Sequence, residues 1–289
     1  MRARSDSVFT SLAAEAVLLA GGGRAILLQI ADAEVGYGVA AHSDFANRPL
    51  ERLANTVTYA YATVFASPEE LARVVSRVNH AHAPVVSSPH EHDEYHRASN
   101  ADEREADGGE RGVGGHPTVH YNAFDRRAQL WVAATLYQTA LTVYEKTFGP
   151  LEPDDAEEVY QRYGVLGSAL QMPAELWPAD RAAFREYWNT AVADLRVTDP
   201  ARRVAHDLLH PRTAPLWLRA VMPVVRLVTT GLLSPELRRA FVLPWSTGSQ
   251  RRFDRLFRVL AVVYPRLPLA VRRLPRDRYM RALRASLQD

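Results

Sequence analysis

Residues 67–83 read SPEELARVVSRVNHAHA, and this stretch carries two signals that decide the fold class. Serine, proline and two glutamates are typical of a helix start, because serine caps free amide groups, proline suits the first turn and acids complement the helix dipole. The apolar residues then recur at steps of four, three and four, and a histidine ends the stripe: Leu71, Val75, Val78 and His82. His80 falls on the opposite face with two arginines. The stretch therefore predicts an amphipathic helix over 68–83 with His82 on its inward face.

The same helical period runs through nearly the whole chain, and no alternating pattern is long enough to predict a sheet. We expect helices at residues 9–20, 24–40, 49–66, 68–83, 124–147, 153–170, 180–195, 199–209, 215–231, 234–242, 250–263 and 276–287. Ser234-Pro235-Glu236 has the same helix-start motif as the segment that begins at Ser67. No internal repeat or composition break divides the 289 residues, of which 47% are hydrophobic and 24% charged. The sequence predicts an all-α fold in which residues 1–289 form a single compact multi-helix domain.

Composition excludes several classes of protein. Cysteine is absent, which excludes disulfides, iron–sulfur clusters and thiolate-bound metals, so any metal must be held by histidine or carboxylate. The chain also lacks a phosphate-binding loop, a dinucleotide glycine fingerprint and the common hydrolase motifs. The most apolar window, 214–233, is broken by Arg219, Pro223 and Arg226, so we expect no membrane span. With no clear leader segment either, we expect a soluble, cytoplasmic protein.

A polar, irregular excursion interrupts the helices at about residues 87–120. Its composition cannot bury enough apolar surface to fold by itself. It contains five histidines among acidic residues: His90, His92, His96, His116 and His120. Such a cluster could bind zinc or nickel, but its spacing fits no closed site. We therefore expect this segment to be a mobile, solvated loop or lid.

Three residues before the excursion stand out as candidates for a site. An inward imidazole needs partners for its nitrogens, so His82 is either a core histidine bonded to a carbonyl or a metal or haem ligand. Arg52 and Thr56 lie four residues apart and therefore share one helical face. A guanidinium beside a hydroxyl suits a carboxylate or phosphate, but a surface ion pair would look the same. Periodicity alone leaves both alternatives open.

The C-terminal part, about residues 199–289, is basic and helical. From residue 251 onward, eleven arginines stand against three aspartates, a local charge of +8. An apolar stripe at helical spacing runs beneath the arginines, which is typical of a core face: Phe253, Leu256, Leu260 and Val263. The alternative is a basic helix on an anionic lipid surface or a nucleic acid. We expect no nucleic-acid partner, and peripheral membrane contact is the alternative use of this part.

Ordered motifs over about residues 20–195 resemble one known family. They are GGRAILLQI at 22–30, VGYGV at 35–39, HSDF at 42–45, PLERL at 49–53, FASPEE at 65–70, the segment 78–85, YNAFD at 121–125, LWVAATL at 130–136 and YEKTFGPL at 144–151. In this order, on a helical chain, they resemble the rubber-oxygenase catalytic domain family. That family includes the latex-clearing proteins and the MpaB-type oxygenase of mycophenolic acid biosynthesis.

The resemblance implies a haem enzyme. Members bind a b-type haem (heme b), and their axial iron ligand is the histidine at the position of His82. The arginine and threonine matched by Arg52 and Thr56 belong to the haem surroundings, where they would serve cofactor binding and catalysis. The implied function is an oxygenase that uses dioxygen on a small apolar or natural-product-like substrate, by hydroxylation or oxidative C=C cleavage. The alternatives are a helical protein that binds haem or lipid without turnover, and a nucleic-acid-binding regulator.

Three departures from the family pattern limit the resemblance. Relatives commonly carry a histidine where this chain has Ala133. The latex-clearing proteins have a lysine where Asn55 stands, so rubber cleavage itself is not implied. The excursion before Tyr121 is also longer than the family pattern leads us to expect.

Overall fold

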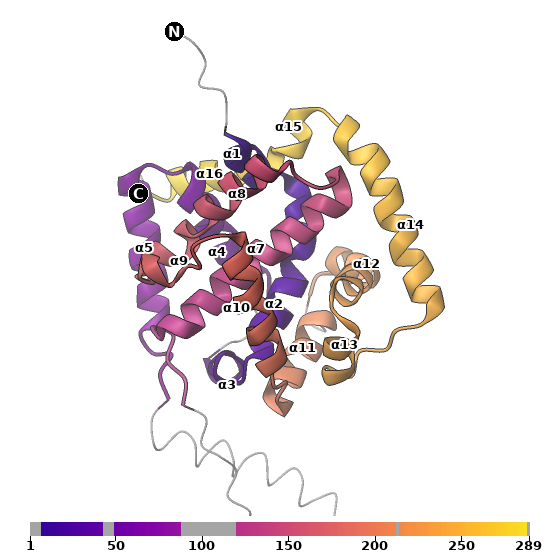
Figure 1. The fold of residues 1–289 in the computed structure, drawn as a ribbon, viewed down its shortest axis with the longest axis horizontal. Coiled ribbons are helices and arrows are strands. Elements are labelled where there is room, and N and C mark those ends of the chain that lie inside the picture. The colour runs from indigo at the N-terminus through magenta and orange to yellow at the C-terminus, as the bar shows by residue number, and fades with distance from the viewer. Residues whose placement is uncertain (1–6, 43–48, 88–119, 212–213, 288–289) are drawn as a thin grey trace, which may run out of the picture.

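The computed structural model describes residues 7–42, 49–87, 120–211 and 214–287, and this part of the chain is helical (Figure 1). Within these ranges there is no β-strand, and the one β-bridge joins Val86 to Asn122. The all-α prediction is confirmed. Much of the excursion, 88–119, lies outside the described residues, and four of its five histidines lie there.

A central helix organises the fold. α7 (Arg126–Phe148) begins at Asp125, whose carboxylate accepts the backbone N–H of Ala128 at 2.8 Å. It ends at Gly149, whose φ of 91° suits glycine better than any residue with a Cβ. Figure 1 shows α7 running through the middle of the ribbon. It contacts the N-terminal elements, α8 (Pro153–Tyr163) and α14 (Thr247–Val263), so it is buried on several sides.

The N-terminal region is more broken than the periodicity predicts. Expected helices at 9–20 and 24–40 are replaced by α1 (Val8–Ala13), a 3-10 helix η1 (Ala16–Gly21), α2 (Gly22–Ala31) and α3 (Ala33–His42). The chain bends by 108° between α2 and α3. Asp32 causes the break, because its backbone is extended and its carboxylate accepts the N–H of Val35 at 3.2 Å, as a helix cap does.

A second layer joins distant parts of the sequence. α4 (Pro49–Phe65) and α5 (Pro68–His82) follow one another and pack together, and the C-terminal α16 (Leu274–Ala285) lies against α4. The expected helix at 153–170 is interrupted at Gly164, so a short α9 (Val165–Ser168) follows α8. Its Leu166 is buried with Met280 of α16. This layer supports the region where the candidate residues lie.

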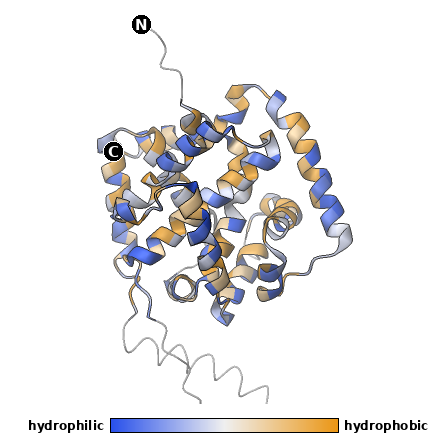
Figure 2. Cartoon of the chain, viewed as in Figure 1, coloured by the Kyte–Doolittle hydropathy of each residue, from blue (hydrophilic) through white to orange (hydrophobic). Residues whose placement is uncertain are grey.

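The remaining helices agree with the sequence to within a few residues. They are α10 (Arg181–Asp194), α11 (Asp199–Leu209), α12 (Leu216–Leu232) and α13 (Pro235–Ala240). The four-residue α15 (Leu269–Arg272) was not expected from the sequence. Both expected caps are present, since Ser67 accepts from Glu70 and Ser234 accepts from Leu237. Figure 2 shows hydrophobic and hydrophilic residues on the same helices, as amphipathic packing requires.

No single helix in the described ranges is long and apolar enough to cross a membrane. The segment Ala16–Ala31, made of η1 and α2, is long and apolar enough only when it is taken together with α3, and the two are bent by 108°.

An aromatic cluster around Tyr137 leads us to expect that the stability of the fold decreases at alkaline pH. The Tyr137 ring, 2% exposed, lies 4.9 Å from Phe184 and 5.3 Å from both Tyr160 and Tyr163, measured between ring centroids. Burial raises the pKa of Tyr137 from 10.0 to about 12. The folded state therefore keeps this phenol neutral over a range in which the unfolded chain ionises it.

Because the folded pKa is the higher one, the stabilisation from neutral Tyr137 is complete below pH 10 and is lost as the pH rises toward 12. We expect the free energy of unfolding to fall more gently with pH above 10 in a Tyr137→Phe variant than in the native protein. Urea titrations at neutral pH and at about pH 11 measure this difference. Equal pH slopes for the two proteins would contradict it.

Candidate functional site

α5 presents His82 at its last turn. The apolar residues of its inward face pack against α4, α9 and α16: Leu71, Val74, Val75 and Val78. His82 continues this side and is half-buried, whereas His80 is exposed, so the predicted facing of the two histidines is confirmed. Val85 donates its N–H to the carbonyl of His82 at 2.8 Å, which turns the chain immediately after the helix.

The chain beyond the excursion returns to cover His82. The ring of Phe124 meets the imidazole edge-on, with centroids 6.4 Å apart and planes at 77°. The two ends of the excursion are held together by backbone hydrogen bonds of 2.9 Å, from Ser87 to the carbonyl of Tyr121 and from Ala123 to the carbonyl of Val85. The position of Phe124 over His82 is therefore set by the β-bridge, whatever course residues 88–119 take.

Tyr121 joins this region to the end of α3. Its hydroxyl lies 3.1 Å from Nε2 of His42, and the two rings meet at 70°. The ring also packs on Gly38, where an added Cβ would lie 3.2 Å from the nearest ring carbon. Glycine at position 38 is therefore what lets Tyr121 approach α3 closely.

The three predicted site residues lie on two consecutive helices that pack together, Arg52 and Thr56 on α4 and His82 on α5. Only two residues separate α4 from α5, so the helices run in opposite directions. Arg52 lies 13 residues before the end of α4 and His82 closes α5, so each is about 20 Å along its helix from the turn. Thr56, one turn after Arg52, is exposed. The Arg52 side chain lies outside the described part of the structure, although its backbone is helical.

Ala133 lies on α7, in the core. It is 2% exposed and packs in an apolar cluster with Leu130, Tyr137 and Met172. A Cβ built on Gly167 would lie 3.4 Å from the Cβ of Ala133, so there is little room beside it. The family's histidine would not fit at this position in the present packing.

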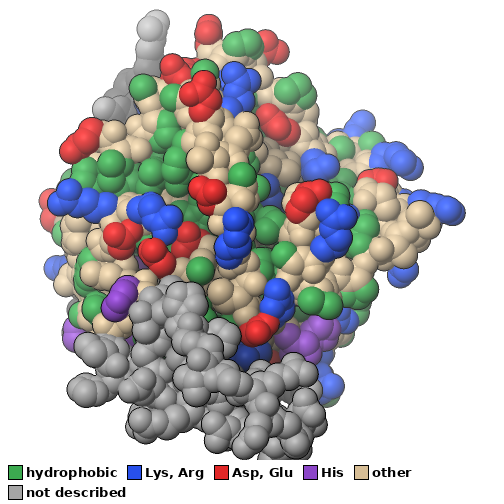
Figure 3. Space-filling model, turned by 60° about the horizontal axis from the view of Figure 1, so that its bottom comes forward, with side chains coloured by type: hydrophobic (Ala, Val, Ile, Leu, Met, Phe, Trp, Pro, Cys, Tyr) green, Lys and Arg blue, Asp and Glu red, His purple; other side chains and the backbone are tan. Residues whose placement is uncertain are grey.

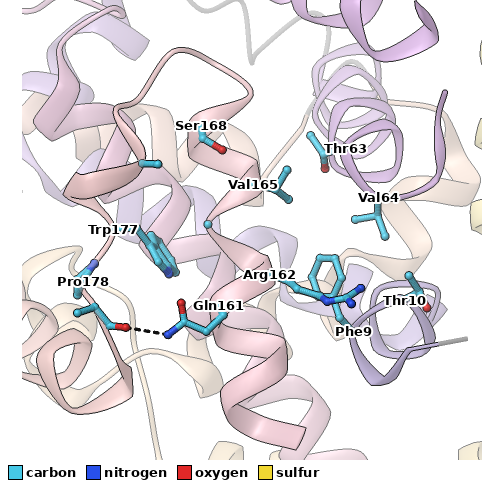
Figure 4. A pocket seen from close by; sticks show the side chains of 13 residues that line it. Phe9, Thr10, Thr63, Val64, Gln161, Arg162, Val165, Ser168, Trp177 and Pro178 are labelled. Atoms are coloured by element: carbon cyan, nitrogen blue, oxygen red, sulfur yellow. Dashed lines mark hydrogen bonds between the residues drawn. The ribbon is translucent and has the colours of Figure 1, made fainter. Parts of the chain in front are cut away.

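A separate cavity of about 600 Å³ opens between α1, α4, α8 and the loop after α9 (Figure 4). Its lining includes Phe9, Val64, Arg162 and Trp177, but none of His82, Arg52 and Thr56. The indole N–H of Trp177 is buried there without a hydrogen-bond partner among the described residues. The cavity lies at the turn end of α4, away from the predicted site.

The described residues contain no group of three or more histidines and carboxylates that could hold a metal ion. A haem needs only one axial side chain from the protein, so this finding concerns zinc-type sites and leaves the haem prediction untested.

Arg24 is an unexpected buried cation between α2 and α7. It is 8% exposed, and its Nη1 donates to the carbonyl of Gln138 at 3.0 Å and to the hydroxyls of Thr139 and Thr142 at 3.1 and 3.2 Å. Burial lowers the pKa of Arg24 to about 10, so it is charged at neutral pH. The residue ties α2 to α7 and lies outside the predicted site.

Sequence reasoning missed two contacts made by the segment after the excursion, that of Phe124 with His82 and that of Tyr121 with His42. His42 and Tyr121 stand 79 positions apart, so no spacing rule joins them. Both lie within motifs that resemble the oxygenase family, and that membership is the signal that could have marked them.

Comparison with known proteins agrees with the motifs. The sequence profile described as "ER-bound oxygenase mpaB/B'/Rubber oxygenase, catalytic domain" matches residues 10–262. Two curated relatives, the uncharacterized proteins Rv2237 of Mycobacterium tuberculosis and Mb2261 of Mycobacterium bovis, are each 42% identical over 151 residues. That match covers 52% of this chain and 59% of each relative, less than two thirds of their length. No solved structure matches the chain.

The profile covers most of the chain and includes the positions of Arg52, Thr56 and His82. The helical structure agrees with the resemblance found in the motifs over about residues 20–195. The chain therefore belongs to the family of ER-bound oxygenase mpaB and rubber oxygenase catalytic domains.

Proposed function

We propose that the protein is an oxygenase that binds a b-type haem through His82 and uses dioxygen on a small apolar substrate. The observation that supports the proposal is His82 itself, half-buried on the inward face at the end of α5, a helix that packs against α4, which carries Arg52 and Thr56. The donor chemistry fits the cofactor, because an imidazole can bind iron axially and a guanidinium can pair with a propionate. The bound haem would supply the iron that activates dioxygen.

Each residue then has a distinct task. His82 would present one imidazole nitrogen to the iron, while the other nitrogen must be held by an acceptor that fixes its tautomer. Arg52 would pair with a propionate carboxylate, and Thr56 would offer a hydroxyl one helical turn away. Phe124, edge-on to His82, would shield the imidazole from water. The reaction would be hydroxylation or oxidative C=C cleavage, and hydroxylation would need an external electron donor.

The proposal is tested by oxygen uptake of haem-loaded protein with a panel of apolar alkenes, under isotopically labelled dioxygen. We expect substrate-dependent uptake and labelled oxygen in the product. Uptake that does not depend on any substrate, with stoichiometric haem bound, would favour a protein that holds haem or lipid without turnover. Ala133 is the observation behind this second function, because the family's histidine is replaced there by tightly packed alanine.

Arg52→Gln should weaken haem binding without abolishing it. A charge-assisted hydrogen bond contributes roughly 1.5–3 kcal/mol, so the dissociation constant should rise about tenfold to a hundredfold. Titration of the apoprotein with haem, followed by absorption, gives this constant. Arg77→Gln is the control, because Arg77 is exposed on the outer face of α5. Equal weakening in both variants would show that only general electrostatics is involved.

A further inference from the structure

The end of α14 and the elements after it form an exposed apolar corner. Between residues 259 and 274, seven large apolar side chains are 36–54% exposed: Val259, Val262, Val263, Leu267, Leu269, Val271 and Leu274. Three belong to α14, two to α15 and one is the first residue of α16, and Leu267 follows the 3-10 helix η3 (Tyr264–Arg266). Figure 1 places α14 and α15 at one edge of the molecule. We call residues 259–274 the α14–α15 corner. Apolar side chains gathered in this way mark an interaction surface.

α14 carries two different stripes. The inner stripe is Phe253, Phe257, Leu260 and Tyr264, which pack on α7, α12 and η1. The outer stripe is Arg255, Val259, Val262 and Arg266, also at steps of four, three and four, and all four are exposed. The inner stripe already satisfies the core, so the outer one is available to a partner.

Val263 corrects the sequence prediction. It was expected on the core stripe but is 51% exposed, because it lies about 100° around the helix from Tyr264, which takes the buried position. The prediction for the other three residues is confirmed, since Phe253 is buried and Leu256 and Leu260 are half-buried.

The corner is rich in arginine, with Asp254 and Asp277 just outside its two ends. Residues 255–276 contain six arginines and no acid. Arg272 and Arg276 pair with Glu15 and Asp277, whereas Arg255 and Arg258 form no ion pair with any described residue. Basic side chains gather at the right edge of the space-filling view, on the side where α14 lies (Figure 3).

We propose that the α14–α15 corner docks on an anionic phospholipid bilayer, with its valines and leucines among the acyl chains and its arginines among the headgroup phosphates. This pattern of exposed aliphatic residues within a basic rim complements such a surface. A second copy of the chain would bring like charges together, because arginines outnumber acids at this corner. A nucleic acid would gain little from aliphatic side chains, since bases stack on aromatic rings. The inference is independent of haem and catalysis, and most of the corner lies beyond residue 262, where the family match ends.

Co-sedimentation of the full-length protein with vesicles tests the proposal. Vesicles of phosphatidylcholine alone are compared with vesicles that also contain phosphatidylglycerol. We expect binding to the anionic vesicles, weakened by salt, and little binding to the neutral ones. Arg255→Gln with Arg258→Gln should weaken binding roughly fivefold for each arginine removed. Val259→Ser with Val262→Ser should weaken it at least tenfold.

Val221→Ser with Val224→Ser is the matched control, because these valines are 44% and 52% exposed on α12, outside the corner. It should bind vesicles like the native protein. Three outcomes would overturn the proposal: no binding to anionic vesicles, equal binding to neutral vesicles, or equal loss in the control. A fourth outcome would also overturn it. If the native protein sediments as a dimer without lipid and the Val259/Val262 variant alone does not, the corner serves self-association.

Discussion

His82→Ala is expected to remove the Soret band that the native protein shows after purification from haem-supplemented cells, whereas His80→Ala is expected to keep it. The two histidines are two residues apart on α5, but His82 is half-buried beside Phe124 and His80 is exposed. Only His82 lies on the side that faces the candidate site. Loss of the one axial protein ligand should therefore release the haem or shift its spectrum.

The two variants control for each other, because both remove an imidazole from the last turns of the same helix. Circular dichroism should show equal helicity for both. Added imidazole should restore a Soret band to the His82→Ala protein, since a free ligand can enter the space left by the side chain. A native protein that is helical yet shows no Soret band would remove the haem proposal, and loss of the band in His80→Ala alone would move the ligand to the other histidine.

The sequence predicts the existence of the helices well, and the reason is local. The periodicity at 68–83 and the caps at Ser67 and Ser234 depend on residues within one or two turns, and the structure confirms all three. The breaks at Asp32 and Gly164 were missed, because apolar residues continue through both positions. At Asp32 a cap formed by its own carboxylate outweighs the continuing period.

The candidate site was predictable only through the family motifs. Periodicity placed His82 on the inner face but could not separate a ligand from a core histidine. The Phe124 ring that contacts it comes from a segment beyond the excursion, which the β-bridge between Val86 and Asn122 holds beside the end of α5. Long-range pairing of this kind leaves no trace in local spacing. At Ala133 the sequence shows the departure from the family pattern, but only the structure shows how tightly this residue is packed.

Arg272→Met is expected to cost about 3–5 kcal/mol of unfolding free energy, the largest stability effect among the predictions made for this protein. Glu15 is 4% exposed, and its carboxylate accepts hydrogen bonds from Nη2 and Nε of Arg272 and from the hydroxyl of Tyr264. That hydroxyl in turn accepts the N–H of Val17 at 3.0 Å. The guanidinium also lies over the Phe148 ring, 5.0 Å from its centroid. Removing it leaves a buried carboxylate without its cation.

Urea unfolding of the native protein, Arg272→Met, Glu15→Met and the double variant measures the coupling between the two residues. The double variant should lose much less than the sum of the single losses, because it leaves no buried charge. Glu236→Gln is the control, since Glu236 and Arg239 form an exposed pair that should contribute less than about 1 kcal/mol. A loss below 1 kcal/mol for Arg272→Met would mean that water screens the Glu15 pair. A loss of the expected size would show that residues 264–272, which follow the end of the family match, hold the N-terminal elements in place.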